Sequence, residues 1–333
     1  MPHSYLLAPL YPLSLLYGLS MRLRARLYRS GIKKIKRLPC KVISVGNLSV
    51  GGTGKTPLVI YIARLLRDRG LKVVVLTRGY KGRMEHGLGL VSDGEKILLK
   101  VEEAGDEAVM MAEKLPGVAV LVGRCRYKAG LYACRHLWTQ VAILDDGFQR
   151  LGLFRDLDIL LLDETALRDH PLPLGRLREP ISSVRRADLI LYPGPEGAME
   201  RLGLPAFRFF MRAHALRGLR DGERTDVTRL KGRKVLALSG IAKPHRFYKT
   251  LKGLGAGVAV HLAFPDHHDF HPKDYDKIYE ASKGAEMIVT TDKDAVRLDH
   301  EHLPHLPAYA LEMEMEIEEG FEDMLLKATG LTT

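Results

Sequence analysis

The sequence of 333 residues predicts an α/β protein with a doubly wound, mainly parallel sheet and a second, smaller α/β domain. Three observations support this prediction. Short apolar runs rich in β-branched residues alternate with helical patterns, a second and shorter set of such runs follows, and two segments of alternating character bracket that second set. Repeated strand–helix alternation is typical of right-handed βαβ units. The chain is 46% hydrophobic, which is enough for two compact cores.

The elements can be assigned in chain order. The first sheet is expected to use six runs, at residues 41–45, 72–77, 118–122, 141–144, 157–162 and 189–192, with a helix over 56–69 after the first of them. The second set lies at 234–238, 258–262 and 287–290. Segments 206–216 and 308–317 alternate and are expected to pair as a two-stranded connector, and a helix near 320–327 should pack back on the first domain.

These elements predict four parts of the chain. They are an N-terminal helix at 1–30, a nucleotide-binding domain at 31–205 that also holds the helix at 318–333, a connector at 206–217 and 307–317, and a smaller domain at 218–306 that closes a cleft.

Charge is distributed unevenly. The formal net charge is +11, no Asp or Glu precedes Asp68, and nine Arg and Lys residues lie between residues 22 and 41. A one-sided basic block usually meets phosphate, either in nucleic acid or on an anionic membrane surface. The three cysteines, Cys40, Cys125 and Cys134, form no CxxC pair, which together with a nucleotide site indicates a reducing cytosolic compartment.

The N-terminal segment favours a membrane surface over a nucleic acid. Residues 5–21 are apolar, but the positive charges follow this stretch, unlike those of a signal peptide, and two prolines make it too short and broken to span a bilayer. Further on, leucines fall on one helical face with arginines beside them: Leu16, Leu19, Leu23 and Leu27 beside Arg22, Arg26 and Arg29. Such a helix either lies on a lipid surface or packs on its own domain.

The strongest motif is a glycine-rich loop between the first strand and its helix. The P-loop template G-x-x-x-x-G-K-[ST] matches Ser49, Val50, Gly51, Gly52, Thr53, Gly54, Lys55 and Thr56, with Ser49 in place of the first glycine. Consecutive backbone N–H groups and the helix N-terminus suit anionic oxygens. We therefore expect ATP here, with Lys55 on the β- and γ-phosphates and the Thr56 hydroxyl on Mg²⁺.

A P-loop also needs a carboxylate at the end of a neighbouring strand to hold Mg²⁺. Asp145 directly follows an apolar run and is the natural candidate. Asp146 is either a second metal contact or a surface turn residue.

A kinase is favoured over a GTPase, because guanine recognition usually uses N-K-x-D and the nearest segment, residues 291–294 (TDKD), has Lys and Asp adjacent. A kinase needs a base for the acceptor hydroxyl. Three segments offer one, at residues 104–108, 176–180 and 264–270. An Asp–His pair across the cleft would form a base that depends on domain closure.

The motifs, taken in order, resemble those of the tetraacyldisaccharide 4′-kinases of lipid A synthesis. The resemblance extends from about residue 10 to residue 300 and is carried by 44–57 (SVGNLSVGGTGKTP), 77–80 (TRGY), 105–107 (GDE), 145–149 (DDGFQ), 177–180 (LREP), 240–244 (GIAKP), 264–268 (FPDHH) and 293–296 (KDAV). One departure is Arg176, where the family commonly has proline.

The resemblance implies transfer of the ATP γ-phosphate to the 4′-hydroxyl of an acylated glucosamine disaccharide 1-phosphate, by a peripheral enzyme at the cytoplasmic face of the inner membrane. It implies Asp106 as the base, assisted by His267, with His268 as the alternative, and Arg178 as a neutraliser of transition-state charge. Asp145, Asp146, Glu179 and Thr56 would organise Mg²⁺ and the phosphates. The acceptor side would hold Arg78, Tyr80, Glu107, Gln149 and His268.

Two functions from different classes follow. The favoured one is an ATP- and Mg²⁺-dependent lipid kinase that acts at an anionic membrane surface, with no nucleic acid and no obligate protein partner. The alternative is a P-loop regulatory or assembly ATPase that acts on a protein partner. The two can be distinguished by whether ATP turnover requires an acylated disaccharide, as it would for the lipid kinase.

Overall fold

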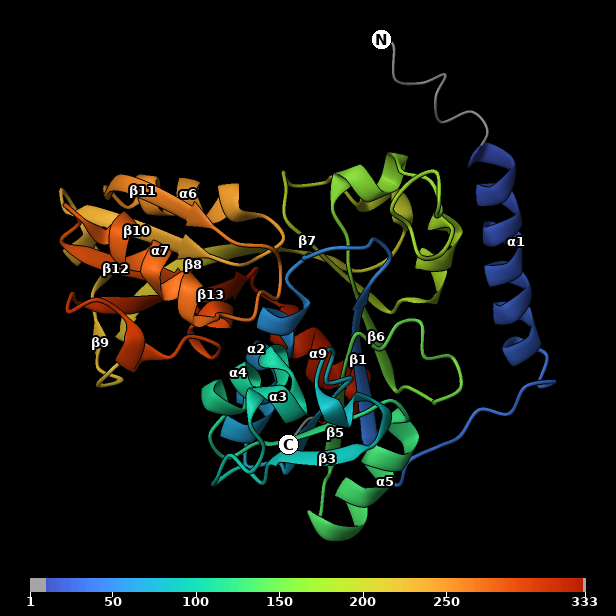
Figure 1. Ribbon diagram of the computed structural model, residues 1–333. Coiled ribbons are helices and arrows are strands. Elements are labelled where there is room, and N and C mark those ends of the chain that lie inside the picture. Colours follow the sequence, from blue (N-terminus) through green and yellow to red (C-terminus); the bar gives the residue numbers. More distant parts are fainter. Residues whose placement is uncertain (1–9, 332–333) are drawn as a thin grey trace.

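The computed structural model describes residues 10–331. Its strands form one continuous sheet of 13 strands. Its edge strands, β11 and β3, lie far apart in Figure 1. The order across the sheet is β11-β10-β12-β13-β8-β7-β6-β1-β5-β2-β4-β3, and β9 pairs with β8 outside this path. The predicted α/β class with a mainly parallel sheet is confirmed.

The first half of the sheet contains the six strands that the sequence predicts. They are β1 (Lys41–Asn47), β2 (Val73–Thr77), β4 (Ala119–Gly123), β5 (Val141–Asp145), β6 (Leu157–Leu161) and β7 (Leu189–Tyr192), all mutually parallel. An edge strand that was not predicted, β3 (Leu88–Ser92), runs antiparallel to β4. The helices here are α2 (Lys55–Asp68), α3 (Val101–Ala104), α4 (Asp106–Lys114) and α5 (Arg126–His136).

The second half of the sheet is smaller. It contains β10 (Lys234–Ser239), β11 (Gly257–Ala263), β12 (Met287–Thr291) and the short β9 (Arg224–Thr225), with the helices α6 (Pro244–Gly253), α7 (Pro272–Ser282) and α8 (Asp292–Ala295). Among the described residues, short 3₁₀ helices occur at Arg83–His86, Glu164–Arg168, Ile181–Arg186, Glu200–Leu202, Val227–Leu230 and His300–His302.

Two long strands join the halves. β8 (Ala206–Gly218) begins parallel to β7 and then continues antiparallel to β13 (Ala308–Ile317), so the sheet is not interrupted. After β13, the helix α9 (Phe321–Thr329) returns to the first half, where Phe321 and Leu325 join the main buried cluster. The division of the chain into domains at residues 31, 206, 218 and 307 stays a prediction; residues 1–9 and 332–333 of the predicted terminal helices lie outside the described residues.

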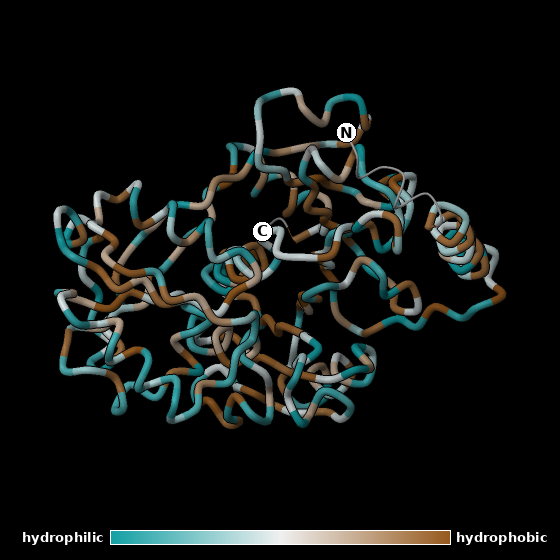
Figure 2. Tube along the Cα trace, turned by 45° about the horizontal axis from the view of Figure 1, so that its top comes forward, coloured by the Kyte–Doolittle hydropathy of each residue, from teal (hydrophilic) through white to brown (hydrophobic). Residues whose placement is uncertain are grey.

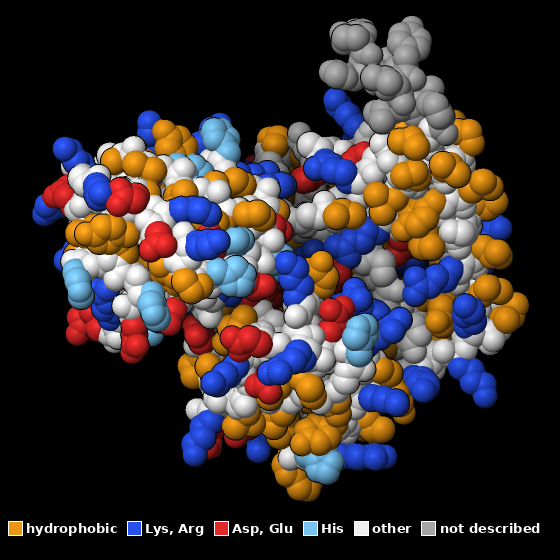
Figure 3. Space-filling model, in the orientation of Figure 1, with side chains coloured by type: hydrophobic (Ala, Val, Ile, Leu, Met, Phe, Trp, Pro, Cys, Tyr) orange, Lys and Arg blue, Asp and Glu red, His pale blue; other side chains and the backbone are white. Residues whose placement is uncertain are grey.

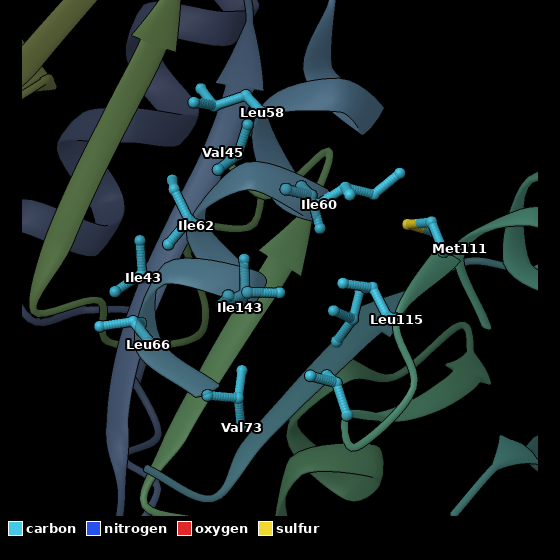
Figure 4. Close-up of a cluster of buried hydrophobic side chains, with 14 of the residues drawn as sticks. Ile43, Val45, Leu58, Ile60, Ile62, Leu66, Val73, Met111, Leu115 and Ile143 are labelled. Atoms are coloured by element: carbon cyan, nitrogen blue, oxygen red, sulfur yellow. The ribbon is translucent and has the colours of Figure 1, made fainter. Parts of the chain in front are cut away.

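The main core lies between α2 and the parallel strands. Leu58, Ile62 and Leu66 recur every four residues, so they share one face of α2, and Figure 4 shows this face against Ile43 of β1 and Ile143 of β5. All five side chains are fully buried. Burial contributes about 1.5–3 kcal/mol for each such side chain. This packing fixes the start of α2, and with it the glycine loop, relative to the sheet. Figure 2 shows the apolar strands inside the molecule.

The helix α1 (Leu10–Arg29) lies at one side of the molecule (Figure 1) and contacts it through small and polar residues. Ser14 donates to the carbonyl of Pro171 (2.7 Å), and Gly18 packs against Pro171 and Pro180. Its outward face carries large apolar residues that are each at least half exposed, namely Tyr11, Leu13, Leu15, Leu16, Leu19 and Leu23 (Figure 3). In residues 10–331, no helix combines the length and apolar character that crossing a membrane requires.

Candidate active site

The glycine loop connects β1 to α2 at the carboxyl edge of the parallel strands. Gly51 and Gly54 have φ of 116° and 96°, in the region that favours glycine, and a Cβ on Gly54 would lie 3.3 Å from Met315. Lys55 and Thr56 form the first turn of α2. The entrance of the loop is tied to the segment that carries Arg178, because the N–H of Val50 donates to the carbonyl of Arg176 (2.8 Å). The loop therefore has the form of a phosphate cradle at a helix N-terminus.

Asn47, the last residue of β1, connects the loop to two basic side chains. It is fully buried, and its Nδ2 donates to the carbonyl of Ser49 (2.8 Å) and to Thr53 Oγ1 (2.9 Å). Its Oδ1 accepts from Lys55 Nζ and from Arg178, both at 3.1 Å. Sequence reasoning did not assign Asn47 a role, although it lies inside the 44–57 motif between the strand and the glycines.

Asp146 faces the same two cations. Its carboxylate lies 3.5 Å from Lys55 Nζ and 2.7 Å from Arg178 Nη1. Burial raises the pKa of Asp146, but the charges of Lys55 and Arg178 outweigh burial and hold the pKa below its ordinary value. Its backbone φ is 53°, which marks a sharp turn directly after β5. Lys55, Asp146 and Arg178 thus form one charged cluster at the loop.

Asp145 offers a free carboxylate oxygen at the end of β5. Its Oδ2 accepts from Thr77 Oγ1 (2.8 Å), while its buried Oδ1 has no hydrogen-bond partner. Burial, with the charges of Glu107 and Asp146, raises the pKa of Asp145 to about 6. A buried carboxylate oxygen without a partner, beside a P-loop, fits a Mg²⁺ ion or its coordinated water.

Glu179 already has a cationic partner. Both of its carboxylate oxygens accept from Arg186, at 2.7 and 3.0 Å, and the Arg186 guanidinium lies 4.5 Å from the ring centre of Phe148. Within residues 10–331, no three His, Cys, Asp or Glu side chains gather as a metal site would require. Thr56, Asp145, Asp146 and Glu179 are therefore not a preassembled ligand set, and the metal role of each stays a prediction.

Asp106 and His267 meet across the two halves of the sheet. Asp106 begins α4, is 4% exposed, and lies 2.8 Å from His267 Nδ1 through its Oδ2. Burial raises the pKa of Asp106, but the hydrogen bond from His267 and the charges of Lys293 and Arg297 outweigh it, so the pKa lies below its ordinary value. The carboxylate is thus held ionised where the two halves of the sheet meet.

Nearly the whole chain is similar to proteins of one known family. A family model described as tetraacyldisaccharide-1-P 4′-kinase matches residues 6–330. A tetraacyldisaccharide 4′-kinase of Desulfatibacillum aliphaticivorans is 42% identical over 330 residues, which cover 94% of this chain and 90% of the relative. The chain belongs to the tetraacyldisaccharide 4′-kinase family.

Other members of this kinase family are similar to the same extent. The enzyme of Geobacter metallireducens is 44% identical over 302 residues, 88% of each chain. The crystal structure of the Aquifex aeolicus family member in complex with ATP matches with a TM-score of 0.82 at 40% identity, covering 97% of this chain and 98% of that chain. The predicted family, the kinase class and the cofactors ATP and Mg²⁺ are confirmed, and the alternative of a regulatory or assembly ATPase is not favoured.

The remaining predicted site residues of this family member lie as follows. His268 Nε2 is 2.8 Å from Asp274 and therefore points away from Asp106. The Tyr80 ring contacts His267 edge-on, with 5.3 Å between ring centres, whereas Arg78 pairs with Glu85 at 2.6 Å. Glu107 and Gln149 contact Lys293 (3.3 Å) and the carbonyl of Asn47 (3.0 Å), respectively.

A pocket of about 310 Å³ borders the glycine loop. Gly52, Thr53 and Gly54 form one wall. The others come from the segments after β6 and β7, from β8 and from α6: Leu162, Asp163, Pro193, Gly194, Phe209, Phe210, Met211 and Arg246. Apolar and aromatic side chains beside a phosphate cradle suit a flat nucleotide base.

Proposed function

We propose that this chain transfers the γ-phosphate of ATP to the 4′-hydroxyl of a tetraacyldisaccharide 1-phosphate, and that Asp106 and His267 direct the acceptor. The hydrogen bond between these two side chains, across the halves of the sheet, is the observation that carries the proposal. It joins a buried, ionised carboxylate from the nucleotide-binding half to an imidazole from the smaller half.

On the donor side, the loop amides and Lys55 hold the β- and γ-phosphates, and the base of ATP occupies the 310 Å³ pocket. Arg178 shifts from its contact with Asp146 toward the charge that develops on the transferring group. Asp145 and Asp146, with Thr56, would hold Mg²⁺, which would supply neutralising charge at the phosphate oxygens.

On the acceptor side, Asp106 accepts the proton of the 4′-hydroxyl. As the 4′-oxygen bonds to phosphorus, the bond from phosphorus to the β–γ bridging oxygen breaks and ADP leaves. The low pKa of Asp106 makes it a weak base, so its main effect is to orient the hydroxyl, and the proton moves late in a loose transition state. Tyr80, whose ring contacts His267, would contact the sugar beside the pair, and Arg78, two residues earlier in the chain, would contact it as well.

The helix α1 would bind the membrane surface and lie near the acyl chains of the substrate. Its exposed leucines would enter the lipid surface, while Arg22, Arg26 and Arg29 contact lipid phosphates. This helix supports a peripheral position at the cytoplasmic face of the inner membrane. The substrate is itself a lipid, so it would reach the cleft without leaving that surface.

The test is transfer of labelled phosphate from Mg-ATP to a tetraacyldisaccharide 1-phosphate in detergent micelles. Asp106→Asn should lose transfer by at least about a hundredfold and still bind Mg-ATP. The adjacent histidines provide a matched pair, because only His267 contacts Asp106. His267→Gln should lower kcat, and His268→Gln should not. ATP hydrolysis at one rate with and without the disaccharide would instead support an ATPase.

A further inference from the structure

One matched motif, residues 293–296, has no assigned role. It forms α8, directly after β12, and its position is set by the fully buried Asp294. Asp294 accepts from the N–H of Gly240 (3.0 Å), from Thr291 Oγ1 (2.6 Å) and from Arg297. The preceding residue, Lys293, is therefore held on a rigid turn rather than on a mobile loop.

The Lys293 ammonium reaches three acceptors at once. Its Nζ lies 2.9 Å from His267 Nε2, 3.3 Å from Glu107 Oε1 and 3.4 Å from Asp266 Oδ1. An ammonium has three donors and no acceptor, so each of these contacts can be a hydrogen bond that Lys293 donates. Because Glu107 belongs to α4 and the other two precede α7, Lys293 also links the two halves of the sheet beside the Asp106–His267 pair.

The contact with the ring has a chemical consequence. Because Lys293 can only donate, His267 Nε2 must present its lone pair, and the ring proton must be on Nδ1. Nδ1 then donates to Asp106 Oδ2 at 2.8 Å. We propose that Lys293 is a positioning residue: the Asp106 carboxylate requires a proton on Nδ1, and Lys293 keeps Nε2 without one, so that His267 stays in the tautomer that donates to Asp106. The catalytic consequence rests on the proposed function of that pair.

Other groups around the pair do not duplicate this contact. Arg297 lies 3.4 Å from Asp106 Oδ2 but is committed to Asp294 and to the carbonyls of Gly240 (3.1 Å) and His268 (2.9 Å). Lys81 donates to the backbone carbonyl of His267 (3.1 Å), not to its ring. The φ of 56° at His267 is uncommon for a residue other than glycine, so this backbone conformation depends on the surrounding contacts.

Three variants of the full chain test the proposal. Lys293→Met removes the donor, Lys293→Arg keeps a donor, and Lys273→Met removes the same charge from an exposed position at the start of α7. We expect Lys293→Met to lower kcat by about 10- to 100-fold, the equivalent of one lost charge-assisted hydrogen bond. The KM for ATP should change less than twofold, Lys293→Arg should recover most of kcat, and Lys273→Met should match the parent.

The decisive measurement is ¹⁵N NMR of histidine-labelled protein, with His267 assigned by the His267→Gln variant. The parent should show a protonated Nδ1 and an unprotonated Nε2, and Lys293→Met should lose this pattern. An unchanged tautomer in Lys293→Met would overturn the proposal. A rise in the KM for ATP with kcat unchanged would also overturn it, because Lys293 would then contact the phosphates.

The NMR result does not depend on the reaction. If Asp106→Asn and His267→Gln both retain phosphate transfer, the proposed function of the pair fails, while the tautomer still decides the role of Lys293. If Lys293→Met adds less than twofold to the loss in His267→Gln, the two residues act through one contact, as proposed. A full additional loss would show that Lys293 acts independently of His267 and would overturn the proposal.

Discussion

Asn47 is the residue whose replacement most directly tests the donor side of the site. The change Asn47→Leu keeps the volume of the side chain and removes its amide, so Lys55 and Arg178 each lose an acceptor at 3.1 Å. It also leaves the carbonyl of Ser49 and the hydroxyl of Thr53 without the Nδ2 donor. Of the contacts described above, the two cations would then keep those with Asp146.

The size of the effect follows from these contacts. A hydrogen bond to a charged group contributes about 1.5–3 kcal/mol. Because Asp146 still holds Lys55 and Arg178, we take about 1.5 kcal/mol for each lost contact, or about 3 kcal/mol for both. If that free energy is lost from the transition state, kcat/KM falls by about 100- to 200-fold.

The assay is transfer of labelled phosphate to the disaccharide in micelles, with the midpoint of thermal unfolding measured in parallel. Gln149→Met is the control, since it removes one neutral hydrogen bond to the backbone of Asn47. Gln149→Met should reduce transition-state stabilisation by about 1 kcal/mol, which lowers kcat/KM about fivefold. A loss below about fivefold in Asn47→Leu, with folding unchanged, would refute the argument that Asn47 holds the two cations in position.

Three further outcomes are expected. Burial raises the pKa of Asp145 to about 6, so its carboxylate is ionised above pH 6 and protonated below it; the apparent KM for Mg²⁺ should therefore rise about tenfold for each pH unit below 6, and a flat profile from pH 5 to 7 would contradict this. Glu179→Gln leaves the Arg186 charge buried without a counter-charge, so in the absence of Mg²⁺ the free energy of unfolding should fall by about 3–5 kcal/mol; unchanged stability with a loss of Mg²⁺ dependence would instead make Glu179 a metal ligand. Replacing three exposed leucines of α1, Leu16, Leu19 and Leu23, with glutamate should abolish sedimentation of the protein with anionic vesicles and leave the midpoint of thermal unfolding unchanged. Retained sedimentation would show that α1 does not make the membrane contact.

The parts of the molecule that depend on local sequence were predictable. The glycine loop is contiguous, and the strand before it and the helix after it carry clear periodicities, so residues 49–56 could be assigned without a structure. Asp145 could be assigned as well, because the end of a buried parallel strand beside a P-loop places its side chain at one edge of the sheet. The strand β3 was missed because it is short, lies at the sheet edge and contains Gly89.

Contacts between distant segments were not predictable in the same way. Nothing in the residue types decides between His267 and His268, which are neighbours; the turn at His267 and the contact of His268 with Asp274 separate them. The partner of Glu179 is seven residues away on a 3₁₀ helix, and no spacing rule indicates it. Asn47 has significance only because Arg178, 131 residues later, reaches the same oxygen as Lys55.

The return of α9 to the first half of the sheet bears on how the chain is made. Phe321 and Leu325 belong to the same buried cluster as Ile43, yet about 280 residues are synthesised between them. Until α9 has left the ribosome, part of the apolar face of the strands around the glycine loop therefore stays exposed to solvent. Chaperone binding to nascent chains should persist until residue 325 has emerged, and premature termination within β13 should yield an aggregating product rather than a shorter enzyme.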